Sequence, residues 1–498
     1  MKIDYSANPP HECATTALVM FVTSFDSIVD KRLKQLDSAS DGIIRTLLAS
    51  GEFTGSSGEM VCINRPDGYA ASRVVLAGLG PRKTCTPDSY RQMAGLLSRY
   101  KPLTCCDSAT FHLGTVSEPE TFQAVIEGCI LGSYRMLKYK TDEASLAGEN
   151  LSEVTYAIDN RRLLNRLQKS VERGCVTAGG QINVRRLSAL PGCDLTPKMF
   201  AAEAVKTADK LKGLSCRVLD QKEIKAEKMG ALMAVAQGSV EPPRFVILEY
   251  KGGRKTQKPI VLVGKGVTFD SGGLSLKAAD MMIEMNGDMT GAAVVLSTMQ
   301  AAVLLQLPLN LVGLMPLAEN MPSGHAIRPS DVVTTRKGIT VEIINTDAEG
   351  RLILADALDY ANKFDPQAVI DIATLTGATL YILGYSGAPI LGNHDDLLER
   401  IRAASEATAE RVWPLPIWDD FRNALKSNIA DIVNSAGKTA GTATAAAFLE
   451  NFIGDWPWAH IDIAYVDIEK KGAPYTPKGT TGIGVRLLID LLSNWKKL

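Results

Sequence analysis

The sequence predicts an α/β protein in which a smaller N-terminal α/β domain is joined by a linking helix to a larger C-terminal α/β domain with a mixed sheet. Two observations predict this class. Short, continuous apolar runs, typical of strands buried on both faces, alternate along the chain with helical patterns. The chain has 498 residues, of which 46% are hydrophobic and 22% charged, as in an ordinary globular protein of about two to four domains.

The first part of the chain contains a recognisable strand and two helices. Val74–Ala77 is an apolar run followed by glycines, as expected of a strand that ends in a turn. Residues 89–100 carry apolar side chains at i, i+3 and i+4, and residues 120–138 form a second helical pattern. Thr141–Glu153 is polar and acidic, so we expect a surface connection there.

A helix with basic residues follows and separates the two halves. Leu163, Leu164, Leu167 and Val171 recur at helical spacing within residues 160–180. We therefore predict an N-terminal α/β domain at 1–160, a linking helix at 161–188 and a catalytic domain at 189–498. The N-terminal domain shows no chemical motif, and we assign it subunit contacts or spacing by default.

The second half repeats the alternation of strand and helix. The predicted strands are Phe245–Glu249, Pro259–Val263, Leu309–Leu314, Val341–Ile344 and Ala368–Ile372. The predicted helices are residues 197–212, 291–306, 353–363, 396–411 and 443–452. Continuous apolar strands between helices favour a parallel or mixed sheet that is covered on both faces.

Charge and composition exclude several classes of function. The formal net charge is −1, which offers no bulk attraction to nucleic acid or to an anionic membrane. Met289–Ala318 has no charged residue, but Pro308 and Pro316 interrupt it, which favours a buried helix and strand over a membrane span. The N-terminus has charges at positions 2 and 4 and no apolar region after them, so we expect no signal peptide.

Cysteine and histidine usage narrows the chemistry. The nine cysteines all lie before residue 217 and none forms C-x-x-C, which is typical of a reducing compartment and predicts a cytoplasmic protein. The five histidines form no H-E-x-x-H. A metal site in this chain would therefore be built mainly from oxygen ligands.

Two segments concentrate carboxylates directly after predicted strands. Asp270 and Asp288 follow the first of these strands, and Asp347 and Glu349 follow the second. Ligands of open α/β sheets bind at the carboxyl ends of strands, so both segments are expected at one site. Four clustered carboxylates in apolar surroundings would repel one another unless cations lay among them, and a pair of divalent metals meets that need.

Each element of this pattern also has a simpler interpretation. Asp347 and Glu349 could only cap the next helix, and Asp270 with the glycines after it could be a plain turn. His460, flanked by apolar residues, is better explained as a core histidine with a satisfied partner than as a ligand. The glycines beside Lys265 lack the frame of a phosphate loop, and no G-x-S-x-G serine motif occurs.

The co-occurrence of three motifs resembles one family. Asn345-Thr-Asp-Ala-Glu-Gly-Arg-Leu352 is similar to the signature of the leucyl aminopeptidases, the hexameric two-metal cytosol aminopeptidases. Gly264-Lys-Gly-Val-Thr-Phe-Asp-Ser-Gly-Gly273 and Asp288-Met-Thr-Gly-Ala-Ala293 resemble the other two metal-binding segments of that family. Shorter similarities, such as Thr374–Ala378 and Ala459–Ala464, extend the resemblance over about residues 190–498.

The resemblance implies a role for each matched residue. Metal ligands are expected at Lys265, Asp270, Asp288, Asp347 and Glu349, with Asp270 and Glu349 bridging two divalent ions, Zn or Mn, with Co or Mg as further candidates. Lys277 and Arg351 would be the catalytic pair. Substrate would contact Lys277, Asp288, Met285, Thr374, Leu375 and Gly377. A lysine that binds metal must be neutral, and two adjacent dications would lower its pKa.

The implied reaction is removal of the N-terminal residue, leucine or another apolar residue, from peptides that have a free N-terminus. A metal-bridging water would attack the scissile carbonyl, Lys277 would stabilise the oxyanion and Arg351 would hold a bicarbonate as base. The free α-amine would ligate a metal. Members of the family form homohexamers, so the resemblance implies a homohexamer. We expect neither a membrane nor a nucleic-acid partner.

Three departures from the family pattern bear on specificity. Tyr465 stands where glycine is usual, and a large ring near the pocket could reshape side-chain preference. Asn286 stands where lysine is common, with little effect expected. Ser188–Gly192 differs from the usual Asn-Thr-Pro-Pro. Two other functions stay open: a non-catalytic hexameric scaffold or nucleic-acid-binding homologue, and a two-metal phosphoesterase.

Overall fold

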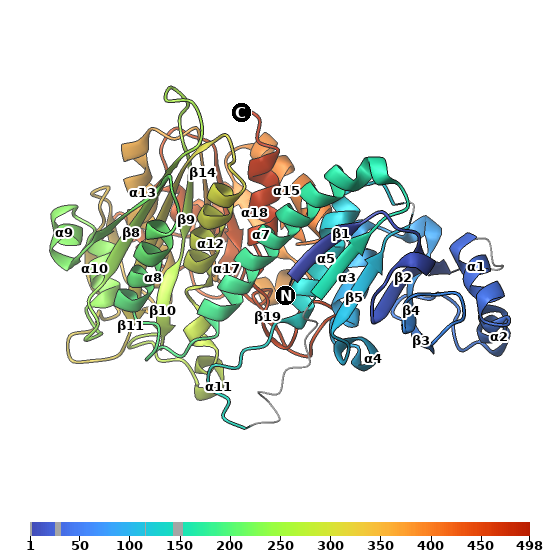
Figure 1. Ribbon diagram of the computed structural model, residues 1–498. Coiled ribbons are helices and arrows are strands. Elements are labelled where there is room, and N and C mark those ends of the chain that lie inside the picture. The colour runs from blue at the N-terminus through green and yellow to red at the C-terminus, as the bar shows by residue number, and fades with distance from the viewer. Residues whose placement is uncertain (1, 25–30, 115, 143–152) are drawn as a thin grey trace. The chain divides into compact units, whose positions relative to one another are not determined.

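A computed structural model describes residues 2–24, 31–114, 116–142 and 153–498, and the chain forms two compact units (Figure 1). The smaller unit comprises Met1–Gly179 and Lys471–Lys478, and the larger comprises Gly180–Lys470 and Gly479–Leu498. The boundary falls inside one helix, α7 (Leu164–Ser188). Most of the expected connection at 141–153 lies outside the described residues.

The smaller unit is built on a six-stranded sheet of order β1-β6-β5-β2-β4-β3. All neighbours are parallel except β3 and β4, which are antiparallel. The strands are β1 (Lys2–Ser6), β2 (Ala17–Ser24), β3 (Met60–Asn64), β4 (Arg73–Pro81), β5 (Ser108–His112) and β6 (Glu153–Ala157). The buried β2 and β4 are continuous apolar runs, as a parallel sheet covered on both faces requires.

Helices cover both faces of this sheet. One core contains side chains of α3 (Pro87–Leu97), α5 (Pro119–Ser133) and the first half of α7, packed against Val19 and Val75. The other core lies between the opposite face and the two helices α1 (Lys31–Ala39) and α2 (Ile43–Ser50). A short helix, α4 (Lys101–Thr104), precedes β5.

The larger unit is built on a nine-stranded mixed sheet of order β16-β15-β18-β14-β9-β11-β8-β7, with β10 also paired to β11. The central strands β18, β14, β9 and β11 are parallel, and β10 is parallel to β11. β8 is antiparallel to both β7 and β11, and β15 is antiparallel to β18 but parallel to β16. The strands are β7 (Leu214–Leu219), β8 (Arg244–Lys251), β9 (Ile260–Gly264), β10 (Gly266–Asp270), β11 (Asn310–Asn320), β14 (Ala368–Ala373), β15 (Ala388–Gly392), β16 (Val412–Pro414) and β18 (Trp458–Asp462).

Helices also cover this sheet on both faces. On one face α12 (Thr290–Leu304) contacts β9, β11 and β14, and α8 (Pro197–Asp209) and α18 (Val485–Ser493) pack beside it. On the other face the core is formed by α10 (Gly230–Ala236), α13 (Gly350–Ala361) and α17 (Gly441–Glu450). The remaining helices are α9 (Gln221–Ala226), α11 (Ala279–Met282), α14 (Thr379–Ile382), α15 (Asp395–Thr408) and α16 (Asp419–Asn423).

Short strands complete the larger unit outside the main sheet. The strands β12 (Val332–Thr334), β13 (Thr340–Glu342) and β17 (Ile432–Val433) form a separate three-stranded sheet, and β19 (Ile468–Glu469) pairs with β20 (Gly479–Thr480). The predicted strand at 341–344 is β13, so it does not belong to the main sheet as its apolar run suggested. The uncharged run at 289–318 forms α12 and β11, and no helix among the described residues is long and apolar enough to cross a membrane.

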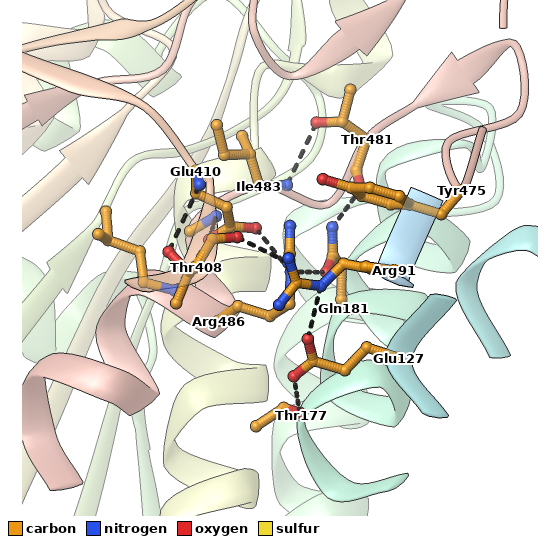
Figure 2. A network of polar contacts seen from close by, with 12 residues as sticks. Arg91, Glu127, Thr177, Gln181, Thr408, Glu410, Tyr475, Thr481, Ile483 and Arg486 are labelled. Carbon is orange, nitrogen blue, oxygen red and sulfur yellow. Dashed lines mark hydrogen bonds and ion pairs between the residues drawn. The ribbon is translucent and has the colours of Figure 1, made fainter. Parts of the chain in front are cut away.

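Each unit contains a buried ion pair that involves a helix (Figure 2). In the smaller unit, Arg91 on α3 donates to Glu127 on α5 at 2.9 Å, and Glu127 also accepts a hydrogen bond from Thr177 on α7 at 2.8 Å. In the larger unit, Arg486 on α18 lies 3.4 Å from the carboxylate of Glu410. The first pair joins α3 to α5, and the second joins α18 to the loop after α15, so each buried charge helps to fix how these segments pack.

Candidate metal centre

The carboxyl ends of four parallel strands meet at one edge of the main sheet. β9 leads into Lys265, β10 ends at Asp270, β14 leads into Thr374 and β18 ends at Asp462. A cavity of about 330 Å³ opens here. Every predicted ligand and substrate contact lines this cavity: Lys265, Asp270, Lys277, Met285, Asp288, Asp347, Glu349, Thr374, Leu375 and Gly377.

Three of the predicted carboxylates converge. One oxygen from each of Asp270, Asp347 and Glu349 lies within 4.8 Å of the others. Asp270 and Glu349 are almost fully buried, and Asp347 is half-buried. Asp347 and Glu349 enter from the loop between β13 and α13, so the second acidic segment reaches the cavity from the small sheet. Neither side chain caps α13, and the capping interpretation is therefore wrong.

Lys265 lies between the fourth carboxylate and this cluster. Its Nζ contacts Asp288 at 2.7–2.8 Å and Glu349 at 2.8 Å, and donates to the backbone carbonyl of Thr374 at 2.9 Å. Thr374 Oγ1 also donates to Asp288, at 2.8 Å. A Cβ on Gly350 would lie 2.5–2.9 Å from the Lys265 side chain, so glycine is required there for the lysine to reach the site.

Lys277 occupies the opposite side of the cluster. Its Nζ lies 2.8 Å from Asp270 and 2.5 Å from Asp347. The loop that carries it turns at Gly272, whose φ of +85° lies in the left-handed region and whose N–H donates to Asp270 at 2.9 Å. Asp270 therefore ends a strand, caps the turn and faces the cavity at once.

Burial and mutual repulsion set the electrostatics of the cluster. Burial raises the pKa of Asp270 to about 6 and raises the pKa values of Asp288 and Asp347. Burial also acts to raise the pKa of Glu349, but the ammonium groups of Lys265 and Lys277 outweigh it, so the pKa of Glu349 is lowered. At Lys265 burial is outweighed by the surrounding carboxylates, which raise the pKa of the lysine.

Sequence reasoning missed the polar residues that hold these ligands. Asn320, at the end of β11, donates from Nδ2 to Asp270 at 2.8 Å and to the Thr346 carbonyl at 3.0 Å, joining the two acidic segments. Asn434 accepts from the backbone N–H groups of Ile344 and Asn345. Neither asparagine lies in a recognisable motif, because each acts on a segment far away in the sequence.

Asp462 organises one wall of the cavity. Its carboxylate accepts hydrogen bonds from the N–H of Leu375 at 3.0 Å and from Thr376 Oγ1 at 2.6 Å. The loop that was predicted to contact substrate is thereby tied to β18. The His-Ile-Asp segment was visible in the sequence, but its role depends on β18 lying beside β14.

The remaining predicted residues occupy distinct places. Arg351 is buried in α13, is not among the residues that line the cavity, and donates to the Asn434 carbonyl at 2.9 Å. Burial lowers the pKa of its guanidinium to about 10. His460 is buried in β18 and pairs with Asp371 at 2.5 Å, so the core interpretation of this histidine is confirmed.

The departures from the family pattern have structural consequences. Tyr465 has a φ of +69°, a backbone conformation that favours glycine. Its side chain lines the cavity, and its ring packs edge-to-face against the ring of Tyr385 with the ring centroids 5.9 Å apart. Asn286 donates to the carbonyls of Ser188 and Leu190, both at 3.0 Å, so it anchors the segment after α7.

The donor set fits divalent cations. Four carboxylates and a lysine nitrogen converge on one cavity, and their negative charge is opposed only by two ammonium groups among the residues that line this part of it. Carboxylate oxygens with nitrogen suit Zn or Mn, and the oxygen atoms lie close enough to share ions. Asp270 contacts Lys277, and Glu349 contacts Lys265.

Family comparisons match nearly the whole chain. The model of the cytosol aminopeptidase family, catalytic domain, matches residues 182–489, and the model of its N-terminal domain matches residues 19–143. A probable cytosol aminopeptidase of Syntrophotalea carbinolica is 44% identical over 92% of this chain and 93% of its own. One of Geobacter sulfurreducens is 42% identical over 98% and 97%.

Solved structures are also similar to this chain over nearly its whole length. A tomato leucine aminopeptidase mutant is 29% identical with a TM-score of 0.88, covering 99% of this chain and 96% of its own. The bottromycin maturation enzyme BotP is 34% identical with a TM-score of 0.84, covering 96% of this chain and 99% of its own. Both similarities extend over the two units rather than over the metal-binding segments alone.

Proposed function

The chain belongs to the cytosol aminopeptidase family and is an aminopeptidase, and from this premise we propose that it removes the N-terminal residue of peptides at a two-metal centre. The supporting observation is the convergence of Asp270, Asp347 and Glu349 beside Lys265 and Asp288. Two divalent cations held by these residues would supply Lewis acidity and would lower the pKa of a bound water toward neutral pH.

We assign the five ligands as the sequence predicts. Lys265, Asp270, Asp288 and Glu349 would hold one ion, and Asp270, Asp347 and Glu349 the other. Lys265 must lose a proton to bind, and the raised pKa of this lysine in its carboxylate surroundings means that cations have to displace that proton. Mn or Zn is our candidate, because the solved structures include BotP in complex with Mn.

Lys277 and Arg351 would act on the reacting peptide. The Lys277 ammonium lies at the cavity, 2.8 Å from Asp270, where it can donate to the carbonyl oxygen as negative charge develops. Arg351 would hold a bicarbonate that accepts the proton of the attacking water. The supporting observation is that its buried Nε has no hydrogen-bond partner among the described residues.

The other wall of the cavity would position the N-terminal residue. The backbone of Thr374, Leu375 and Gly377 would contact the substrate main chain, fixed in place by Asp462. Asp288 would lie near the α-amine, and an acylated amine would be a poor ligand. Met285 offers an apolar wall, which supports the proposed preference for leucine or another apolar side chain.

Hydrolysis of leucyl-amide beside N-acetyl-leucyl-amide tests the proposal, with enzyme reloaded with Mn or Zn. We expect metal-dependent cleavage of the free-amine substrate alone. Lys277→Ala should lower kcat by about 100-fold or more with metal content unchanged. A protein that binds metal and cleaves neither of these amides nor a panel of other free-amine substrates would contradict the proposal.

The assembly and the location are carried over from the family as proposals. We propose a homohexamer, which light scattering of the purified protein tests directly. We also propose a cytoplasmic protein that takes peptides as its partners. A net charge of −1 supports peptide hydrolysis over nucleic-acid binding as the main role, and a scaffold would not need every ligand and both catalytic cations.

A further inference from the structure

A buried carboxylate outside the metal cluster lines the same cavity. Asp467 lies between β18 and β19, with 6% of its surface exposed. Its backbone is held on both sides, because its N–H donates to the Ile463 carbonyl at 3.1 Å and its carbonyl accepts from Thr481 at 2.8 Å. The carboxylate is therefore placed by a fixed backbone rather than by a flexible loop.

Asp467 lies close to the reacting end of the cavity. A Cβ built on Gly287 would be 3.9 Å from Asp467 Oδ2, and Gly287 immediately precedes the predicted ligand Asp288. A residue whose amine lies at Asp288 would have its side chain within reach of this carboxylate. Neither the metal centre nor the catalytic pair uses Asp467.

Asp467 has a cation near it, Lys470, but that ammonium forms its ion pair with Glu284 and not with Asp467. Among the described residues no lysine, arginine or histidine nitrogen forms an ion pair with Asp467, whereas the nearby Glu284 is paired with Lys470. Burial, with a smaller contribution from the charge of Glu284, raises the pKa of Asp467 to about 7, while backbone N–H groups and, more weakly, Lys470 stabilise the carboxylate. A buried carboxylate of this kind is stabilised when a ligand brings the missing positive charge.

The walls between the metal cluster and Asp467 suit an aliphatic stem. Met285 and Ile468 line the cavity with apolar atoms, and the rings of Tyr465 and Tyr385 close another side. Lysine and arginine bury their methylene stems against apolar surface while the charged group makes polar contacts. The cavity therefore offers successive surfaces for an amine, an aliphatic stem and a terminal cation.

We propose that Asp467 is a specificity-determining residue that makes this aminopeptidase prefer an N-terminal lysine or arginine to a neutral residue of the same length. The inference rests on the proposed aminopeptidase function and replaces its apolar preference with a preference for a cation on an aliphatic stem: the walls accept the stem, and Asp467 selects the charged end. A charge-assisted hydrogen bond in a buried site gives discrimination of about tenfold or more.

Lysine and norleucine provide the test, because their side chains have similar length and differ in charge. For the wild type we expect kcat/KM for lysyl-amide to exceed that for norleucyl-amide at least about tenfold. Asp467→Asn should bring this ratio close to one, mainly by lowering the lysyl value. Asp280→Asn is the matched control, since Asp280 lines the same cavity from an exposed position and should shift the ratio much less.

A binding measurement separates this inference from the proposed function. L-lysinol and L-norleucinol have no scissile bond, and calorimetry on metal-loaded enzyme should show tighter binding of lysinol to the wild type and no such difference in Asp467→Asn. A wild-type ratio at or below one overturns the inference whether or not the variant folds. An unchanged ratio in folded Asp467→Asn also overturns it. Absence of turnover with intact lysinol selectivity would contradict only the proposed function.

Discussion

The buried carboxylate of Asp467 makes a prediction about stability that needs no substrate. Its pKa is about 7 in the folded chain and about 3.9 in an unfolded one. Between these values the folded state holds a proton that the unfolded state has lost. The stability that Asp467 contributes is therefore complete below about pH 4 and disappears as the pH rises through 7. The Asp467→Asn variant has no titrating group at this position, so its stability does not fall with pH for this reason.

The magnitude follows from the two pKa values. Between pH 5.5 and 8 the unfolding free energy of Asp467→Asn should rise relative to the wild type by about 2 kcal/mol, because each pH unit below the folded pKa contributes about 1.4 kcal/mol. The larger unit has roughly 300 residues, and its unfolding entropy near the midpoint is about 0.6 kcal/mol/K. The difference in Tm should therefore change by about 3 °C.

Thermal melts of both proteins in buffers from pH 5.5 to 8 measure this difference. The charged neighbours of Asp467, Glu284 and Lys470, are common to both proteins, so their own titration cancels to first order. Asp280→Asn, at an exposed position, should give a difference that stays flat with pH. If the difference in Tm between Asp467→Asn and the wild type does not change with pH, the carboxylate is hydrated. If that difference falls as the pH rises, the carboxylate is paired with a cation. Either result would refute the reasoning.

Three further predictions concern the metal centre. Asn320→Ala should weaken metal affinity about tenfold or more, since it removes the amide that orients Asp270, and metal titration by calorimetry measures this. Asp462→Ala should lower kcat/KM at unchanged metal content, because the wall that faces substrate loses its anchor. Loading metal-free protein with Mn or Zn should raise its Tm. It should also release protons into a weakly buffered solution, because Lys265 is an ammonium before the metal binds. Metal binding without proton release would argue against lysine as a ligand.

Much of the fold follows from local patterns in the sequence. Buried strands such as β9 and β14 are continuous apolar runs, and the helices between them show period-3.6 patterns, so both fold class and element order could be predicted. The pairing of β13 with β12 and β17 could not, because a three-residue strand has the same apolar signal in a small sheet as in a large one. The limits 1–160, 161–188 and 189–498 stay a prediction; the two compact units divide at 179/180, and Lys471–Lys478 groups with the smaller unit.

Some residues of the candidate site could be predicted from the sequence and others could not. Ligands could be named because they occur in short, dense motifs, and Asp270, Asp347 and Glu349 do converge. Asn320 could not, because an asparagine at the end of a strand becomes a positioning residue only when another segment comes within reach.

Asp467 shows the limit most clearly. An isolated aspartate near the end of a chain gives no reason to expect burial, since most aspartates are exposed. It becomes chemically distinct because the segment after β18 brings its carboxylate beside Gly287, and because the cation that could have balanced it, Lys470, pairs with Glu284 instead. The metal ligands follow the family pattern, whereas the selection of a side chain depends on which charges the fold leaves unbalanced around them. Specificity in this chain is therefore better inferred from the packing of the cavity wall than from the motifs that identify the reaction.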